Sequence, residues 1–299
     1  MLLAAGLGTR MRPLTAAIPK PTLPALDRPM IRRLIDQLAD HGIESAVVNS
    51  HAHPELLAEA LRGAAIPVEH VFEAELRGSG GGIAGARALL EDATFLVLNA
   101  DMVLDLRLPE LISRHREIGG LATLALRDDP RKSDFGTIGF GTAGQVTRIT
   151  SMIDLGAEAG SGLFTGVQVM EPEIFDAMPS HSCFEILPHT YLPLLSDGAR
   201  VGTWLQPTSD AWHPIGTPRE LLDANLALLA ESGASRWVGA GAVIPASASL
   251  GPGAIIGAGA ELSADTSIRN SVVLPNARPP AGSALERAIA FEREVWRDD

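Results

Sequence analysis

Residues 3–11 have the sequence LAAGLGTRM, and PKP follows at residues 19–21. An apolar start that runs directly into a glycine-rich turn is typical of a short buried strand followed by a loop whose N–H groups approach phosphate oxygens. The loop is not a Rossmann fingerprint, because Met11 stands where the third glycine would be. It is not a Walker A loop either, because no Gly-Lys-Ser/Thr follows. The stretch predicts a phosphate-binding loop at the start of an α/β domain.

Beyond this loop, helical and strand patterns alternate as far as about residue 230. The run TFLVLN at 94–99 is continuously apolar, which is typical of a strand buried on both faces. We therefore expect residues 1–232 to form a Rossmann-like α/β domain, with a mostly parallel sheet and helices on both faces. Residues 137–169 have shorter strands and more glycine, and are expected to form a partly antiparallel region for a second substrate. Helical patterns lie at 29–41, 54–62, 81–91, 109–118, 185–195 and 218–230.

A different pattern begins near residue 236. Apolar residues recur every six positions, separated mostly by small residues and proline, at Val238, Ile244, Leu250, Ile256, Leu262, Ile268 and Leu274. This hexapeptide spacing predicts a short left-handed parallel β-helix over 236–284. Residues 285–299 are expected to form a closing helix or tail. Because so short a stack has exposed ends, we expect it to pack on the first domain or to form a homo-oligomer.

Composition excludes several classes of protein. The net charge is −12 with no cluster of Lys and Arg, so a nucleic-acid surface is not expected. The single cysteine, Cys183, excludes an internal disulfide and fits a cytoplasmic location. No apolar run approaches the roughly 20 residues that span a bilayer. Met1 to Ala5 has no basic residue before it, so a signal peptide is not expected. This first strand is short, and the true N-terminus is expected to lie a few residues upstream.

The order G-x-G-T-R, a short gap and P-K-P resembles the signature of the sugar nucleotidylyltransferases, also called NDP-sugar pyrophosphorylases. The resemblance covers nearly the whole chain, repeats included. It implies that the loop backbone cradles a nucleoside triphosphate through Ala4, Ala5, Gly6, Gly8 and Thr9. It also implies that Arg10 stabilises the leaving pyrophosphate and that Lys20 lies near the α-phosphate. Fixed cations suit that chemistry, because charge develops on the transferring and leaving groups.

Two further segments fit the same family. Residues 77–83, RGSGGGI, resemble its G-T-A/G-G segment, which implies that Gly78, Ser79 and Gly80 line the nucleobase. On its own, this segment could equally be a flexible glycine hinge. Asn99-Ala-Asp101 resembles the N-A-D motif whose aspartate binds Mg²⁺, a metal that commonly takes one or two carboxylates plus phosphate oxygens. Asp101 is therefore both the expected metal ligand and a catalytic residue, with an Asx turn as the alternative.

The sugar and metal half departs from the family pattern. The stretch WHPIGTP at 212–218 has Pro214 where the family has its second metal-binding aspartate. Asp210 is about 13 Å away in a strand, at roughly 3.3 Å per residue, which is too far to replace it. The family's E-K-P is absent, and Arg148 is the possible substitute for its lysine. Sugar-side matches remain at Phe135-Gly136, which resembles Y-G, and at Thr165-Gly166.

Three functions are compatible with these patterns. The first is an active transferase that forms an NDP-sugar and pyrophosphate from an NTP and a sugar 1-phosphate, with Mg²⁺. The second is a catalytically impaired relative that binds a nucleotide or NDP-sugar and regulates or scaffolds a partner, which Pro214 and the missing E-K-P motivate. The third is an acyltransferase built on the repeat. That function is disfavoured because no histidine follows His213.

Overall fold

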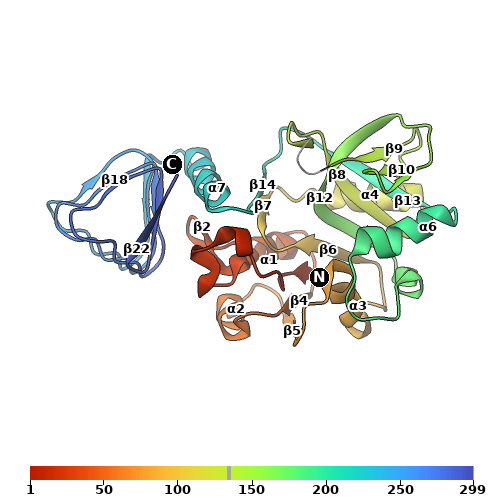
Figure 1. Cartoon of the computed structure of the whole chain (residues 1–299), viewed down its shortest axis with the longest axis horizontal. Helices are drawn as coiled ribbons and strands as arrows, with labels where there is room; N and C mark the ends of the chain where they lie inside the picture. Colours follow the sequence, from red (N-terminus) through yellow and green to blue (C-terminus); the bar gives the residue numbers. More distant parts are fainter. Residues whose placement is uncertain (133–135, 299) are drawn as a thin grey trace.

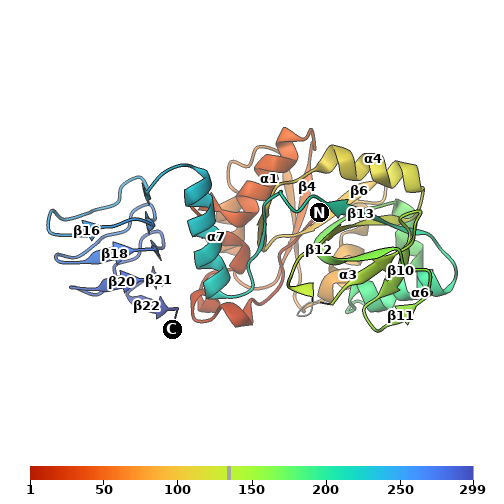
Figure 2. The same cartoon turned by 90° about the horizontal axis from the view of Figure 1, so that it is seen from above.

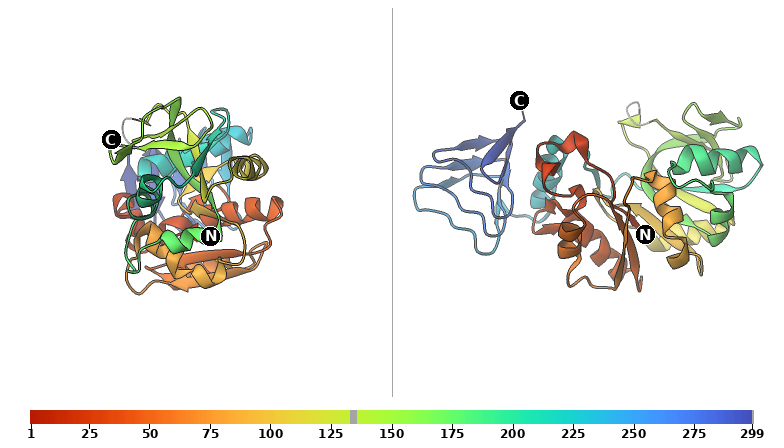
Figure 3. Two further views of the ribbon diagram at one scale, coloured as in Figure 1. Left: turned by 90° about the vertical axis from the view of Figure 1, so that its right-hand side faces the viewer. Right: turned by 60° about the horizontal axis from the view of Figure 1, so that its bottom comes forward.

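The computed structural model describes residues 1–132 and 136–298. An α/β body and a C-terminal stack of short strands lie end to end, with helix α7 (Pro218–Glu231) between them (Figure 1). Figure 3 shows the N-terminal elements of the body beside α7 and next to the stack. Within the described ranges, no helix has the length and apolar character needed to cross a membrane.

The body is built on the central part of a ten-stranded sheet, in the order β5-β4-β1-β6-β12-β8-β13. Strand β12 is antiparallel to both of its neighbours, and the other pairs in this order are parallel. The predicted mostly parallel sheet is confirmed. The strands are β1 (Leu2–Leu3), β4 (Ala46–Ser50), β5 (Val68–Phe72), β6 (Phe95–Asn99), β8 (Ala122–Arg127), β12 (Gly160–Met170) and β13 (Val201–Gln206).

Helices cover both faces of this sheet, as Figure 2 shows. Helices α1 (Met30–Asp40), α2 (Pro54–Leu61) and α4 (Leu108–Ile118) pack on one face. Helices α3 (Gly78–Gly85) and α6 (Leu192–Ser196) pack on the other. Side chains of β6 alternate between the two layers: Leu96 and Leu98 enter the first, whereas Phe95 and Val97 enter the second. This alternation explains why the strand is apolar throughout.

The predicted helices at 29–41, 54–62, 109–118 and 218–230 are confirmed, with ends shifted by at most one residue. The predicted bounds of the helix at 81–91 are wrong. Helix α3 already begins at Gly78 and ends at Gly85, and a separate 3-10 turn follows at Arg87–Leu89. Helix 185–195 is a π-helical turn, Leu187–Tyr191, followed by α6. Other 3-10 turns are Thr9–Met11, Leu14–Ala16, Lys20–Thr22 and Pro172–Ala177.

Residues 137–169 form the expected antiparallel region. Strands β9 (Ile138–Phe140), β10 (Val146–Ile149) and β11 (Ile153–Asp154) extend the sheet from the first half of β12. The register of β12 against β8 shifts between Phe164 and Gln168, around Gly166 with φ of +85°. Two small antiparallel pairs complete the body: β2 (Pro24–Ala25) with β3 (Arg28–Pro29), and β7 (Met102–Leu104) with β14 (Trp212–Pro214).

The C-terminal stack consists of short strands in two sheets. One has the order β15-β17-β19-β21-β22 and the other β16-β18-β20, and all pairs except β21–β22 are parallel. An apolar cluster joins Ile255 and Val272 of the stack to Leu221 of α7 and Met11 of the body. The stack therefore packs on the first domain; the left-handed β-helix stays a prediction. The strands are β15 (Arg236–Val238), β16 (Ser249–Leu250), β17 (Ala254–Ile256), β18 (Ser267–Arg269) and β19 (Ser271–Val273).

The helix expected within residues 285–299 is wrong. The segment forms β20 (Ala284–Glu286), β21 (Ala288–Phe291) and β22 (Glu294–Arg297). Strand β21 is buried along its whole length against β19, so it continues the stack by another layer. Strand β22 then folds back antiparallel, with Trp296 opposite Ile289. Tertiary pairing with a strand of matching register determines the structure here, and local spacing does not.

Candidate functional site

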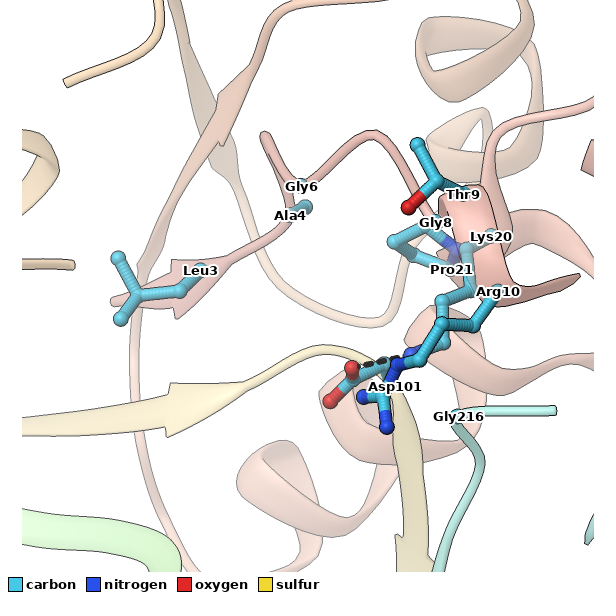
Figure 4. Close-up of a pocket in the computed structure, with 10 residues that line it drawn as sticks. All are labelled: Leu3, Ala4, Gly6, Gly8, Thr9, Arg10, Lys20, Pro21, Asp101 and Gly216. Atoms are coloured by element: carbon cyan, nitrogen blue, oxygen red, sulfur yellow. Dashed lines mark hydrogen bonds and ion pairs between the residues drawn. The ribbon is translucent and has the colours of Figure 1, made fainter. Parts of the chain in front are cut away.

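Three adjoining hollows lie beyond the carboxyl ends of β1 and β6, and Asp101 lines all three. This is the edge at which open α/β sheets bind ligands. The loop hollow is lined by Leu3, Ala4, Gly6, Gly8, Thr9, Arg10, Lys20, Pro21, Asp101 and Gly216 (Figure 4). The α3 hollow is lined by Leu3, Ala5, Gly6, Asn49, Glu73, Leu76, Gly78, Ser79, Asn99, Asp101, Cys183 and Glu185. The β14 hollow is lined by Arg10, Lys20, Asn99, Asp101, Met102, Leu163, Phe164, Thr165, Trp212, Pro214, Ile215, Gly216 and Glu220.

Gly8 closes the glycine loop over Lys20. Its φ is +58°, a conformation that disfavours side chains, and a Cβ atom added there would lie 3.2 Å from the Cβ of Lys20. Its carbonyl oxygen accepts a hydrogen bond of 2.7 Å from the hydroxyl of Thr15. A Cβ at Gly6, by contrast, would meet nothing within 4 Å, so the loop is open toward the hollow at that point. Glycine is therefore favoured at position 8 for two reasons: the backbone has a positive φ, and a side chain would crowd Lys20.

Lys20 and Asp101 form an ion pair at the meeting point of the hollows. Lys20 Nζ lies 2.5 Å from Asp101 Oδ2, and the side chains are 9% and 41% exposed (Figure 4). The lysine stem is buried and brings its charge to the cleft floor, while the aspartate keeps access to solvent. The exposed Arg10 lies close by, with a guanidinium nitrogen 3.2 Å from the position a Cβ on Gly216 would occupy. Two cations thus face the loop hollow.

A buried polar network supports the loop from below. Asn49 Oδ1 accepts a 2.7 Å hydrogen bond from the N–H of Ala4, and Asn49 Nδ2 donates to Glu73 Oε1 at 2.7 Å. Glu73 is 1% exposed, and its other oxygen accepts from the N–H of Arg77 at 3.1 Å. A Cβ on Gly82 would lie 2.7 Å from Asn49 Nδ2. The network therefore connects the glycine loop to the start of α3, and Gly82 leaves room for it.

The glycine-rich start of α3 packs tightly on residues 182–186. A Cβ on Gly80 would lie 2.3 Å from the ring of Phe184, and one on Gly81 would lie 2.1 Å from the carbonyl oxygen of Ser182. Both amides of Gly80 and Gly81 donate to the carbonyl oxygen of Phe184. Gly78 and Ser79 line the α3 hollow, whereas Gly80 is buried beneath Phe184. These glycines therefore permit close packing, and only the first lines the cleft.

Pro214 lies beside Asp101 in the β14 hollow. Strand β14 pairs with β7, with Pro214 opposite Met102, and the N–H of Ile215 donates to the carbonyl oxygen of Asp101. Asp210 cannot replace the missing carboxylate, because Arg107 binds both of its oxygens at 2.9 and 3.0 Å. His213 is half-buried, and burial lowers its pKa below the usual range.

Glu220 places another carboxylate in this hollow. Its Oε2 accepts from the N–H of Gly216 at 2.7 Å and from the hydroxyl of Thr217 at 3.1 Å. The hydroxyl oxygen of Thr217 in turn accepts from the N–H of Glu220. Such a reciprocal cap at the start of α7 fixes the position of the glutamate.

Comparison with known families supplies the decisive observation. The family model described as nucleotidyl transferase matches residues 1–231, which is most of the chain and includes every residue of the cleft. This chain belongs to the nucleotidyl transferase family.

Two curated relatives illustrate the range within this family. A UTP–glucose-1-phosphate uridylyltransferase of Synechocystis is 29% identical over 214 residues, covering 66% of this chain and 55% of that protein. A mannose-1-phosphate guanylyltransferase of Mycobacterium tuberculosis is 28% identical over 303 residues, covering 96% of this chain and 82% of that protein. The chain thus spans just over half the length of the first relative and most of the second.

Solved structures of low sequence identity share the nucleotidyl transferase fold. The crystal structure of HddC from Yersinia pseudotuberculosis matches with a TM-score of 0.63 and 22% identity, over 76% of this chain and 97% of that one. The same protein complexed with GMP-PN matches with a TM-score of 0.62 and 22% identity. Both matches leave about a quarter of this chain uncovered.

Among the described sugar-side residues named from sequence, only Thr165 lines one of the three hollows. Thr165 lines the β14 hollow, but its hydroxyl donates to the carbonyl oxygen of Ala125 within the sheet. Gly166 packs against Asn99, where a Cβ would lie 2.6 Å from Nδ2. Gly136 has a φ of +76° at the entry to β9. Phe135 lies outside the described residues.

Arg148 is committed elsewhere, on β10. It binds Glu158 through Nε at 2.7 Å and Thr137 Oγ1 through a terminal nitrogen at 2.9 Å. The hydrogen bond to Glu158 raises the pKa of Arg148. This ion pair does not support a role for Arg148 as the missing sugar-phosphate lysine.

Four cleft residues escaped the sequence analysis: Asn49, Glu73, Glu185 and Glu220. Asn49 ends a continuous apolar strand pattern, and polar residues at that end of a parallel strand point to the ligand edge. This signal is the same one that identified Asp101. Glu220 follows Thr217 by three residues, so its capping role was accessible from the pattern T-x-x-E. Glu73 and Glu185 had no local signal.

Proposed function

We propose that this chain transfers a nucleotidyl group from a nucleoside triphosphate to a sugar 1-phosphate, giving an NDP-sugar and pyrophosphate. The observation that carries the proposal is the Lys20–Asp101 ion pair where the three hollows meet. A nucleotide needs room for its phosphates and base, and the sugar phosphate needs a third space beside the α-phosphate. The relatives named as uridylyltransferase and guanylyltransferase act on such pairs, which supports the proposal.

The proposed reaction is an in-line displacement. A sugar-phosphate oxygen attacks the α-phosphorus, the bond from phosphorus to the bridging oxygen breaks, and pyrophosphate departs with the electron pair. Lys20 would neutralise charge on the α-phosphate and Arg10 charge on the leaving pyrophosphate, while Ala4 to Thr9 would hold the triphosphate. Fixed cations in a cleft stabilise such charge at no reorganisation cost.

We further propose that Mg²⁺ binds with the triphosphate at Asp101. Asp101 has one oxygen bonded to Lys20, and its side chain is 41% exposed in the cleft, so a carboxylate oxygen is available. Across residues 1–132 and 136–298, no three His, Cys, Asp or Glu residues are arranged to hold a metal ion. A site of one carboxylate completed by phosphate oxygens and water suits Mg²⁺. When bound, the ion would neutralise phosphate charge. Because Pro214 has no side-chain oxygen, the ion would have fewer protein ligands than in relatives with an aspartate there.

One observation favours a second function, that of a nucleotide-binding regulator. Pro214 has no ligand oxygen, and the ion pair with Arg107 occupies Asp210. The test is pyrophosphate release with Mg²⁺, with common nucleoside triphosphates screened against a panel of sugar 1-phosphates and Asp101→Asn as control. Turnover that the control lacks supports the transferase. Nucleotide binding by calorimetry with no turnover for any pair would leave the regulator as the better account.

The remaining assignments are proposals of the same kind. The stack beyond residue 235 is proposed to be a short left-handed β-helix that could also join copies of the chain, as its parallel strand pairs suggest. A cytoplasmic location follows from the proposed triphosphate substrate. A sedimentation experiment on the whole chain and on one ending before residue 236 tests the role in assembly.

A further inference from the structure

The α3 hollow differs in charge from the loop hollow. Besides Asp101, which lines all three hollows, its lining contributes the carboxylates of Glu73 and Glu185 but no lysine or arginine, within the part of the chain that the structure describes. Arg10 and Lys20 line the loop hollow instead. A triphosphate is polyanionic, so its phosphates belong with the cations. The α3 hollow therefore suits the uncharged end of the nucleotide, which is the base.

Glu185 is held rigidly at this end of the cleft. Its Oε2 accepts from the hydroxyl of Ser79 at 2.5 Å and from the N–H of Ser79 at 3.2 Å. The hydroxyl oxygen of Ser79 also accepts from the N–H of Ile186 at 3.0 Å. The side chain of Glu185 is exposed. Its contact with Ser79 is nevertheless fixed, because backbone N–H groups donate both to Glu185 Oε2 and to the hydroxyl oxygen of Ser79. A carboxylate placed this way loses little conformational freedom when it binds a ligand.

The other oxygen, Oε1, is available. No donor among residues 1–132 and 136–298 reaches it, and Glu185 forms no ion pair with a described cation. A Cβ on Gly78 would lie 2.9 Å from Oε1, so a side chain there would cover it. Gly78 also has a φ of +70°, a conformation that disfavours side chains, so both the backbone and the space beside Oε1 favour glycine there. The structure thus leaves an acceptor open toward the hollow.

Glu73 is less suitable for contact with a ligand. It is 1% exposed, and each of its oxygens already accepts a hydrogen bond, from Asn49 and from Arg77. Its role is to hold the loop and α3 together. Glu185 is therefore the carboxylate that a base in this hollow would meet.

We propose that Glu185 recognises the nucleobase and selects guanine over uracil; this inference rests on the proposed function. Guanine presents two adjacent donors, N1–H and the N2 amino group, which match the two oxygens of one carboxylate. Uracil presents one donor between two carbonyl acceptors, which would face the carboxylate unfavourably. A site built to bind particular N–H groups discriminates strongly against analogues that lack them.

The test is calorimetric binding of GTP, ITP and UTP to the whole chain, to Glu185→Gln and to a matched control, Glu44→Gln. Glu44 is exposed in the loop before β4. We expect the unaltered chain to bind GTP at least about tenfold more tightly than UTP, since a hydrogen bond to a charged group is worth roughly tenfold or more. ITP, which lacks the amino group, should fall between them.

Glu185→Gln offers one acceptor and one donor, so it should weaken GTP binding by about tenfold or more and leave UTP unchanged or tighter. Glu44→Gln should leave all three nucleotides unchanged. Ser79→Ala removes the hydroxyl that donates to Glu185 but leaves the Glu185 carboxylate in place. It should therefore reduce the preference for GTP less than Glu185→Gln does. This second variant keeps the test informative if Glu185→Gln does not fold.

Equal weakening of GTP and UTP in Glu185→Gln would overturn the inference, because it would mean that Glu185 only supports α3. Tighter binding of UTP than GTP by the unaltered chain would overturn it as well. If UTP is also the substrate that releases pyrophosphate, the proposed function stands and only the base assignment fails. If no triphosphate binds, the proposed function and the base assignment fail together.

Discussion

Replacement of Asn49 by leucine removes the link between the glycine loop and the buried carboxylate. The N–H of Ala4 and Oε1 of Glu73 would each lose a partner at 2.7 Å. A buried donor left unpaired costs about 1–3 kcal/mol, and losing a hydrogen bond to a charged group costs about 1.5–3 kcal/mol. The added apolar surface returns about 1 kcal/mol. We therefore expect Asn49→Leu to lower the free energy of unfolding by about 3 kcal/mol.

The same change should weaken nucleotide binding by about tenfold. Without its anchor at Ala4, the loop must be ordered when the triphosphate binds. Fixing the backbone of one residue costs about 1–2 kcal/mol, and 1.4 kcal/mol corresponds to tenfold in affinity. Urea unfolding followed by tryptophan fluorescence and calorimetry with the triphosphate measure the two effects separately.

Asn225→Leu is the matched control for this experiment. Asn225 is fully buried and accepts a 2.7 Å hydrogen bond from the N–H of Leu26, while its Nδ2 donates to the carbonyl oxygens of Pro24 and Leu221. It lies on α7, outside the three hollows. This variant should lose about 2–3 kcal/mol of stability with no change in nucleotide affinity. If it weakens nucleotide binding as much as Asn49→Leu does, or if Asn49→Leu binds normally, the anchoring argument is wrong.

Three further predictions concern the cleft and its neighbour. Lys20→Met should lower turnover at least about a hundredfold while changing the free energy of unfolding by no more than about 1 kcal/mol, because Asp101 is 41% exposed and its charge stays hydrated when the lysine is removed; marked unfolding in a thermal melt would contradict this. Pro214→Asp should tighten Mn²⁺ binding to the GTP complex at least about tenfold, as an added carboxylate does at such sites, and a spin-resonance titration that finds no change would refute it. Burial lowers the pKa of His213, so the folded chain resists a proton that the unfolded chain accepts below about pH 6.5. Stability should therefore fall on acidification from pH 7 to pH 5, and urea unfolding should show a smaller fall in His213→Gln.

The parts of the site carried by contiguous residues were predictable from sequence. The glycine loop, Lys20 between its prolines and Asp101 after a buried strand each show their structure locally, because strand ends and glycines constrain the backbone directly. The Asn49–Glu73 pair was not predictable, because its residues are 24 positions apart and meet only once β4 and β5 are paired. The sheet could be inferred as mostly parallel and residues 137–169 as partly antiparallel, but the insertion of β12 between β6 and β8 could not be inferred.

The C-terminal error has a physical cause of its own. Residues 285–299 place Leu285, Ile289 and Trp296 at spacings that a helix would also bury on one face. What decides for strands is the preceding layer, which offers unpaired backbone groups to β21 and, through it, to β22. The six-residue spacing of apolar residues ends at Leu274. The spacing therefore does not predict the last layer of strands, although that layer pairs with the stack.

The distribution of charge in the cleft gives the bound nucleotide a direction. Arg10 and Lys20 lie at the loop hollow, Glu73 and Glu185 at the α3 hollow, and Asp101 where both meet the β14 hollow. A triphosphate placed with its base beside Arg10 and its phosphates beside Glu185 would forgo attraction at one end and meet repulsion at the other. The remaining orientation puts the α-phosphate near Asp101, facing the β14 hollow. In that orientation, and in the proposed reaction, Lys20 would be shared between the nucleotide and the incoming sugar phosphate. The proposed reaction would then need no E-K-P lysine, because one cation would hold both reacting phosphates.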